Sequence, residues 1–106
     1  MAERSIFDIQ ADFCKAMGNP TRLILLHTLR DKPMVVNEIS EATGLAQTMV
    51  SRQLAVLRGV GVVECERHGT EMEYRIADPQ IGEVCDLVRK VLMEQNIKRS
   101  MVFHPQ

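Results

Sequence analysis

Residues 35–59 of the sequence read VVNEISEATGLAQTMVSRQLAVLRG, and residues 62–76 read VVECERHGTEMEYRI. The first stretch predicts a short helix, a turn that contains Gly44, and a second helix from about Ala46 to Gly59. The second stretch predicts a β-hairpin whose tip is His68-Gly69-Thr70. A helix-turn-helix followed by a β-ribbon is a winged helix, an arrangement suited to reading DNA.

The predicted helix over residues 46–59 has one apolar and one polar side. At about 100° per residue, Val50, Leu54 and Leu57 fall on one side, which indicates a face that packs against a core. The opposite side carries no acidic residue, and its side chains are of the types that bond base edges and phosphates in a major groove. We therefore interpret this helix as the reading helix of a DNA-binding protein, with contacts from Gln47, Thr48, Ser51, Arg52 and Arg58.

Less specific interpretations of the same pattern are open. Amphipathic helices with polar outer faces are common, and a helix-turn-helix also serves as a protein-interaction module. The order of elements favours DNA binding, because a turn containing glycine, a polar-faced helix and a ribbon follow one another directly. At the ribbon tip, Arg67 and His68 are predicted to reach phosphates or the minor groove, although solvated tip residues would give the same pattern.

Three stretches together carry a family resemblance: MGNPTRLILL at residues 17–26, EISEATGLAQ at 38–47 and VSRQLAVLRGVGVV at 50–63. Over roughly residues 6–95, the chain resembles the ArsR/SmtB family of bacterial repressors. The resemblance implies a dimeric winged helix, joined through its first and last helices, that represses an operon until a metal, a metalloid or an oxidant reaches the dimer. It does not imply one inducer, because that site differs between members.

Two positions in the reading helix depart from the family pattern. Ala46 stands where a serine is usual, and alanine is a poor helix cap that costs about 1 kcal/mol. Thr48 is expected to take over part of this capping. Gln53 stands where many members have histidine, and its amide offers both a donor and an acceptor, so we expect a changed DNA contact there rather than a lost one.

Apolar spacing outside this region predicts three more helices. Residues 5–17 form the first helix, and residues 20–30 form the second, which begins at Asn19-Pro20. This second helix is expected to bury Leu23, Ile24 and Leu26.

The last predicted helix spans residues 79–98 and carries an apolar stripe that is too long for so small a core. A partner subunit is therefore expected to cover the stripe, which predicts a homodimer. The stripe consists of Ile81, Val84, Cys85, Val88, Val91 and Leu92.

Length and composition predict a single domain. No apolar run is long enough for a membrane span and no signal peptide is visible, so we expect a cytoplasmic protein. An enzyme is not expected, since the sequence has no nucleophile–base pair at informative spacing and no phosphate-binding loop. The predicted domain covers residues 1–106, with dimerisation helices at 5–17 and 79–98, the helix-turn-helix at 35–59 and the wing at 62–76.

The net charge of −1 and the pI near 6.3 are unusual for a DNA-binding domain. The charge is unevenly distributed, however, because residues 46–59 include Arg52 and Arg58 but no acid. Local charge at the contact face matters more than the total. We therefore expect an affinity for double-stranded DNA that depends on two-site docking of a dimer and falls steeply with salt.

The histidines do not indicate a zinc sensor. A Cys-Val-Cys run typical of the family's metalloid sensors is absent at residues 36–40, which read VNEIS. His27, His68 and His104 are far apart in sequence, and none lies on the last helix, where some members carry an Asp/His ligand set. Zinc sensing by either route is therefore not expected.

The sequence has three cysteines, an odd number without close spacing, and these do not predict a disulfide framework. Cys14 and Cys85 are predicted to form the inducer site, with Cys65 as a bystander, because the first and last helices are implied to meet at the dimer interface. Thiolates there could bind a soft ion such as As(III) or cuprous copper, or join as a disulfide or polysulfide. Two cysteines make an incomplete arsenite site, which Cys65 or a non-cysteine ligand would have to complete. The alternative is a regulator without any ligand, whose cysteines are small core residues.

Overall fold

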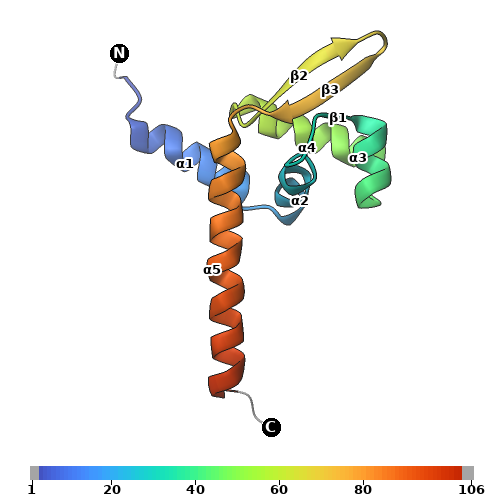
Figure 1. The fold of residues 1–106 in the computed structure, drawn as a ribbon. Coiled ribbons are helices and arrows are strands. Elements are labelled where there is room, and N and C mark those ends of the chain that lie inside the picture. The colour runs from blue at the N-terminus through green and yellow to red at the C-terminus, as the bar shows by residue number, and fades with distance from the viewer. Residues whose placement is uncertain (1–2, 104–106) are drawn as a thin grey trace.

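The computed structural model describes residues 3–103, and His104 lies outside the described residues. The described chain forms five helices and a small antiparallel sheet with the strand order β1-β3-β2, which projects at one edge of the helices (Figure 1). This architecture confirms the predicted winged helix-turn-helix. The elements are α1 (Ile6–Met17), α2 (Pro20–Thr28), β1 (Met34–Val35), α3 (Val36–Thr43), α4 (Gln47–Gly59), β2 (Val63–His68), β3 (Glu71–Ile76) and α5 (Pro79–Phe103).

Local signals set the helix ends. Ser5 and Asp8 form a capping box at the start of α1, in which the Ser5 hydroxyl accepts from the Asp8 N–H and the Asp8 carboxylate accepts from the Ser5 N–H, both at 3.1 Å. Asn19 caps α2 as predicted, because its side-chain oxygen accepts from the Arg22 N–H at 3.1 Å. Gly44 ends α3 at a φ of 78°, a left-handed conformation that glycine adopts without strain.

The core lies where α2, α3 and α4 meet the base of the wing. Val50, Leu54 and Leu57 are fully buried, which confirms the predicted inner face of α4. Their partners are Leu25, Leu26, Leu29, Met34, Ile39, Val62 and Val63.

The prediction for α2 was wrong in part. Leu26 is buried, but Leu23 and Ile24 are 39% and 47% exposed, and Leu25 takes their place in the core. Four consecutive apolar residues at 23–26 are spread around the whole circumference of the helix, so the sequence pattern does not identify the side that faces the core.

The wing contains one strand that the sequence pattern did not predict. β1 is only two residues long and pairs with β3, with Met34 opposite Tyr74 and Val35 opposite Glu73. β2 and β3 form the predicted hairpin, with Gly69 at its tip. The added strand attaches the hairpin to the start of α3, so the wing and the helix-turn-helix form one continuous unit.

The outer helices leave large apolar surfaces uncovered in the single chain. α5 extends well beyond the rest of the molecule (Figure 1) and ends at Phe103 rather than at residue 98. None of the described helices is both long and apolar enough to cross a membrane. The exposed apolar residues of α1 and α5 include Ile6, Phe7, Ile9, Val84, Leu87, Val88, Val91 and Leu92.

Candidate nucleic-acid interface

The outer face of α4 presents the predicted polar side chains to solvent. Gln47, Thr48, Ser51, Arg52 and Arg58 are all exposed, whereas Val50, Leu54 and Leu57 of the same helix are buried. No acidic residue occurs within α4, so this face can approach phosphates without repulsion from its own helix.

The start of α4 is uncapped by any side chain. Ala46 occupies the cap position and offers no acceptor, as expected from its methyl side chain. Thr48 makes no side-chain hydrogen bond within the described chain, so it does not take over the capping predicted for it and its hydroxyl is available to DNA.

Gln47 is held by the preceding helix. Its side-chain amide Nε2 donates to the Asn37 Oδ1 at 2.8 Å, which joins the first turns of α3 and α4. One N–H of the amide is occupied, so the second N–H and the Oε1 of Gln47 are left without a protein partner in the described structure, and they can donate to a base acceptor and accept from a base amino group.

Gln53 occupies a different position from the other predicted contacts. It is half-buried on the flank of α4, and its Oε1 accepts from the Arg22 Nη1 at 2.9 Å. Arg22 also donates from Nε to the Ala16 carbonyl at 2.6 Å, so one guanidinium joins the end of α1 to α4. Arg22 and Asn37 were missed by sequence analysis, because the contacts that give them a role join residues 31 and 10 positions apart and leave no periodic signal.

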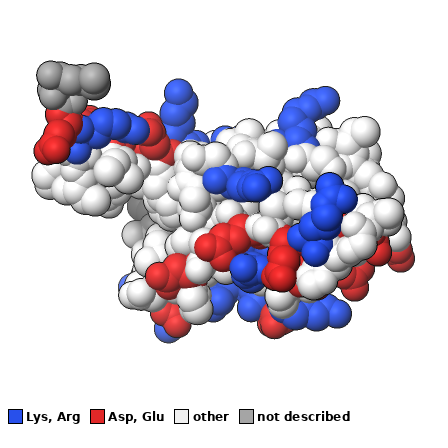
Figure 2. Space-filling model, turned by 90° about the horizontal axis from the view of Figure 1, so that it is seen from above, with Lys and Arg blue, Asp and Glu red and all other residues white. Residues whose placement is uncertain are grey.

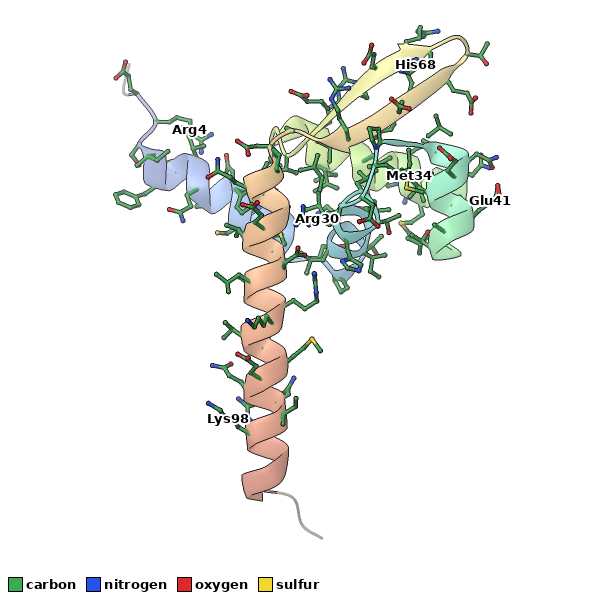
Figure 3. All side chains as sticks on the ribbon, viewed as in Figure 1. Arg4, Arg30, Met34, Glu41, His68 and Lys98 are labelled. Atoms are coloured by element: carbon green, nitrogen blue, oxygen red, sulfur yellow. The ribbon has the colours of Figure 1, made fainter. Side chains whose placement is uncertain are left out.

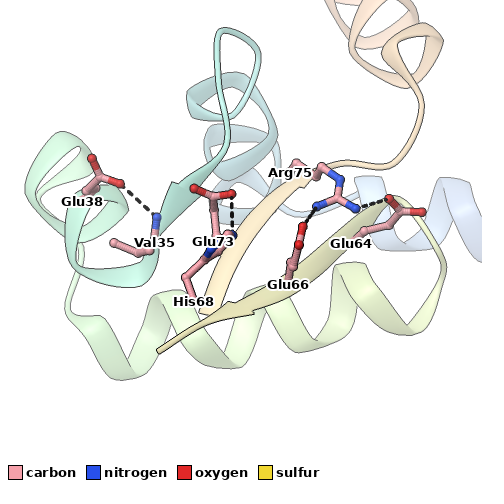
Figure 4. Close-up of polar contacts among 7 residues, drawn as sticks. All are labelled: Val35, Glu38, Glu64, Glu66, His68, Glu73 and Arg75. Atoms are coloured by element: carbon pink, nitrogen blue, oxygen red, sulfur yellow. Dashed lines mark hydrogen bonds and ion pairs between the residues drawn. The ribbon is translucent and has the colours of Figure 1, made fainter. Parts of the chain in front are cut away.

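The wing presents less positive charge than its sequence suggests. Arg75 lies between Glu64 and Glu66, 3.3 Å from an oxygen of each, and the His68 Nε2 lies 3.3 Å from the Glu73 carboxylate (Figure 4). Arg67, in contrast, is exposed and has no carboxylate within ion-pair distance in the described chain. Of the predicted wing contacts, Arg67 is therefore the one with an uncompensated charge.

Acidic and basic side chains are intermixed over the face shown in Figure 2, without one continuous basic patch. Figure 4 shows the ion pairs of Arg75 with Glu64 and Glu66 in the wing and, apart from them, the hydrogen bond from the Val35 N–H to the Glu38 carboxylate at the start of α3. The outer face of α4 and Arg67 at the wing tip carry basic side chains that have no ion-pair partner among the described residues.

The structure brings Cys14 and Cys85 to one groove. The groove lies between α1 and α5, has a volume of about 470 Å³, and is lined mainly by apolar side chains that include Phe13, Met17 and Val88. Cys14 is exposed and Cys85 is half-buried. Burial raises the pKa of the Cys85 thiol, and the positive charge of Arg89 opposes that shift.

Cys65 lies in β2 and borders a separate hollow with Arg58 and Arg75. It therefore does not complete a three-thiolate set in the groove, and Cys14 and Cys85 alone do not fit the three sulfur ligands of an arsenite site. Within residues 3–103, no cluster of three or more His, Cys, Asp or Glu side chains is placed to hold a metal ion.

Comparison with known proteins identifies the family of this chain. The bacterial regulatory protein arsR family matches residues 19–64. The uncharacterized HTH-type transcriptional regulator Rv0081 of Mycobacterium tuberculosis is 38% identical over 93 residues, which cover 87% of this chain and 82% of that protein. The chain belongs to the ArsR family.

Solved structures of ArsR-family proteins and related regulators share the fold. The homodimeric winged helix-turn-helix DNA-binding domain of Mb0332 from Mycobacterium bovis superposes with a TM-score of 0.78 at 35% identity, covering 90% of this chain and 93% of that one. The transcriptional repressor BigR from Xylella fastidiosa gives a TM-score of 0.70 at 30% identity, covering 76% and 83%. This ArsR-family chain is therefore a DNA-binding transcriptional regulator.

Proposed function

We propose that the protein is a homodimeric repressor that binds an inverted-repeat operator and releases it when an inducer acts on Cys14 and Cys85. The observation that carries the DNA-binding part is the acid-free, exposed polar face of α4. Two-fold symmetry of a dimer would place two such faces in successive major grooves, about 34 Å apart or a small multiple of that distance.

The contacts proposed for the operator follow from exposure and pairing. Gln47, Thr48, Ser51 and Arg52 face outward from α4 and are assigned to base edges and nearby phosphates. Arg58 in the last turn of α4 and Arg67 near the wing tip are assigned to the DNA backbone, with His68 next to Arg67. Gln53 is assigned a contact through the second N–H of its Nε2, because its Oε1 already accepts from Arg22 and its Nε2 donates once to the Met49 sulfur.

The inducer part is supported by the shared groove of Cys14 and Cys85. Two thiolates suit a soft ion such as cuprous copper, for which the Met17 thioether in the same groove is a further sulfur donor. As(III) would need a third ligand from outside the groove. An oxidant offers a second route: with a peroxide, the two thiols form one disulfide and lose two protons and two electrons, and the peroxide is reduced to two molecules of water. Either event would alter the contact between α1 and α5.

The test measures operator release by the wild type and by Cys14→Ser, Cys85→Ser and Cys65→Ser. Operator duplexes selected from random DNA are bound, then treated with cuprous ion, arsenite, peroxide or a persulfide donor. We expect the wild type and Cys65→Ser to release the operator after treatment, and Cys14→Ser and Cys85→Ser to remain bound to it. If Cys14→Ser and Cys85→Ser release the operator as the wild type does, the proposed inducer site at these two cysteines is contradicted.

A ligand-independent regulator is the second candidate, and one observation favours it. Cys85 is partly buried and packs against the core, as a small apolar residue would. In that case, the wild type would bind the selected operator and respond to none of the four reagents. A protein-interaction module would select no DNA sequence at all.

A further inference from the structure

An ion pair joins the long last helix to the body of the molecule. Arg30, just beyond the end of α2, reaches toward α5 (Figure 3), where its Nε donates to the Asp86 Oδ2 at 2.9 Å and its Nη2 lies 2.8 Å from the same oxygen. The other carboxylate oxygen of Asp86 accepts from Arg89 on α5. The hydrogen bond from Arg30 lowers the pKa of Asp86, so the carboxylate is charged at neutral pH.

Gly82 provides the space that this ion pair needs. A Cβ atom at Gly82 would lie 2.5 Å from the Cδ and the Nη1 of Arg30, well inside van der Waals contact. Arg30 therefore lies directly on the backbone of α5, one turn before Asp86. A glycine inside a helix weakens that helix, so its presence here is explained by the close approach of the arginine.

The contacts of α5 with the body lie in its first turns, where Ile81 and Cys85 pack against the core. The helix contacts mainly α2 and β3, and from residue 91 onward its described side chains are exposed. The Arg30–Asp86 pair is 27% and 39% exposed at its two side chains, which makes it a partly shielded contact rather than a loose surface pair. In the described structure, the Arg30–Asp86 pair is the polar contact that adds to this apolar packing and joins α5 to the end of α2.

We propose that Arg30 and Asp86 are positioning residues for DNA recognition, whose ion pair over Gly82 fixes α5 on α2 and so sets the separation of the two reading helices in the dimer. The connection continues from α2 to α4 through the buried Leu25 and Leu26 and through the hydrogen bond from Arg22 to Gln53. The inference rests on the proposed binding of a dimer to an inverted repeat.

The experiment measures how strictly the full-length protein requires one spacing between half-sites. Operators selected by the wild type are remade with one or two base pairs added or removed between the half-sites, and the affinity for each is measured together with the dimer dissociation constant. Gly82→Ala is the central variant. It keeps both charges and raises the helix propensity of α5, but puts a methyl group where Arg30 lies.

Gly82→Ala is expected to fold and dimerise at least as well as the wild type, yet to discriminate between spacings about threefold less. Asp86→Asn should relax the spacing requirement similarly, and Asp86→Glu should restore part of it. Base preference within each half-site should not change. Asp12→Asn is the matched control, because it breaks an Arg4–Asp12 pair of the same 2.8 Å length that joins the segment before α1 to the middle of α1 and links no two helices.

The proposal is overturned if Gly82→Ala and Asp86→Asn keep the spacing discrimination of the wild type, or if Asp12→Asn relaxes it equally. It is also overturned if discrimination is lost only at concentrations where the variant dimers dissociate. A wild type that selects no inverted repeat would contradict the proposed function instead, so the two failures are distinguishable.

Discussion

Charge pairing of single side chains separates the arginines that are free to meet DNA from those that are not. Arg75 is compensated by Glu64 and Glu66, whereas Arg52 has no carboxylate within ion-pair distance in the described structure. The sequence alone does not show which of these arginines is paired, because the ion pairs of Arg75 depend on the register between β2 and β3. An unpaired guanidinium retains all its donors for a guanine or a phosphate.

Arg52→Ala is expected to cost about 1–3 kcal/mol of operator affinity and to relax base preference, because a bidentate contact to guanine would be lost. Titration of operator and scrambled duplexes with the variant measures both effects. Arg67→Ala is the contrasting variant: it should weaken binding to all sequences alike and lower the slope of log affinity against log salt by about one. Unchanged operator affinity in Arg52→Ala would exclude Arg52 from the interface.

The individual elements show which parts of the fold were readable in the sequence. The inner face of α4 was predicted correctly because Val50, Leu54 and Leu57 repeat at four- and three-residue steps, and the polar Ser51, Arg52 and Gln53 stand between the first two. β1 was missed because a two-residue strand derives its stability from pairing with β3, about forty positions later. Cys14 and Cys85 were brought together by the family resemblance, whereas the Arg30–Asp86 pair needed the tertiary structure.

The turn between α3 and α4 gives a prediction at this level. Gly44→Ala is expected to lower the free energy of unfolding by about 1 kcal/mol, because alanine at a φ of 78° is strained although no atom lies near its Cβ. Gly59→Ala is the matched control: it lies in α4 without a positive φ, and should be neutral or stabilising by up to about 1 kcal/mol. Urea unfolding of both variants at one protein concentration measures the difference; equal stabilities would contradict the prediction.

The whole molecule is organised around two surfaces that it cannot cover alone. The apolar residues of α1 and α5 lie away from the core, and Val88 in the middle of α5 is 54% exposed. A chain of 106 residues buries a limited core, so a second copy adds substantially to the apolar surface removed from water.

Val88→Glu is expected to dissociate the dimer and to abolish operator binding together, because a carboxylate would be buried in the apolar interface. Lys90→Glu changes charge on the same helix, away from the apolar stripe, and should leave the dimer intact. Sedimentation at micromolar concentration, with operator titration in parallel, gives both readouts. A stable wild-type monomer would contradict the assignment of this surface.

The carboxylates that surround Arg75 also affect how the protein searches a chromosome. Attraction to DNA of arbitrary sequence is almost entirely electrostatic, and it keeps a basic regulator sliding along the duplex between specific sites. Here the net charge is −1 and the glutamates of the wing compensate Arg75, so the acid-free face of α4 and Arg67 are left to attract arbitrary sequence, and we expect that attraction to be weak. We therefore expect such a protein to reach its operator chiefly by diffusion through solution, with brief excursions along the duplex. A larger share of its copies is consequently free at any moment, and a modest number per cell can occupy the target.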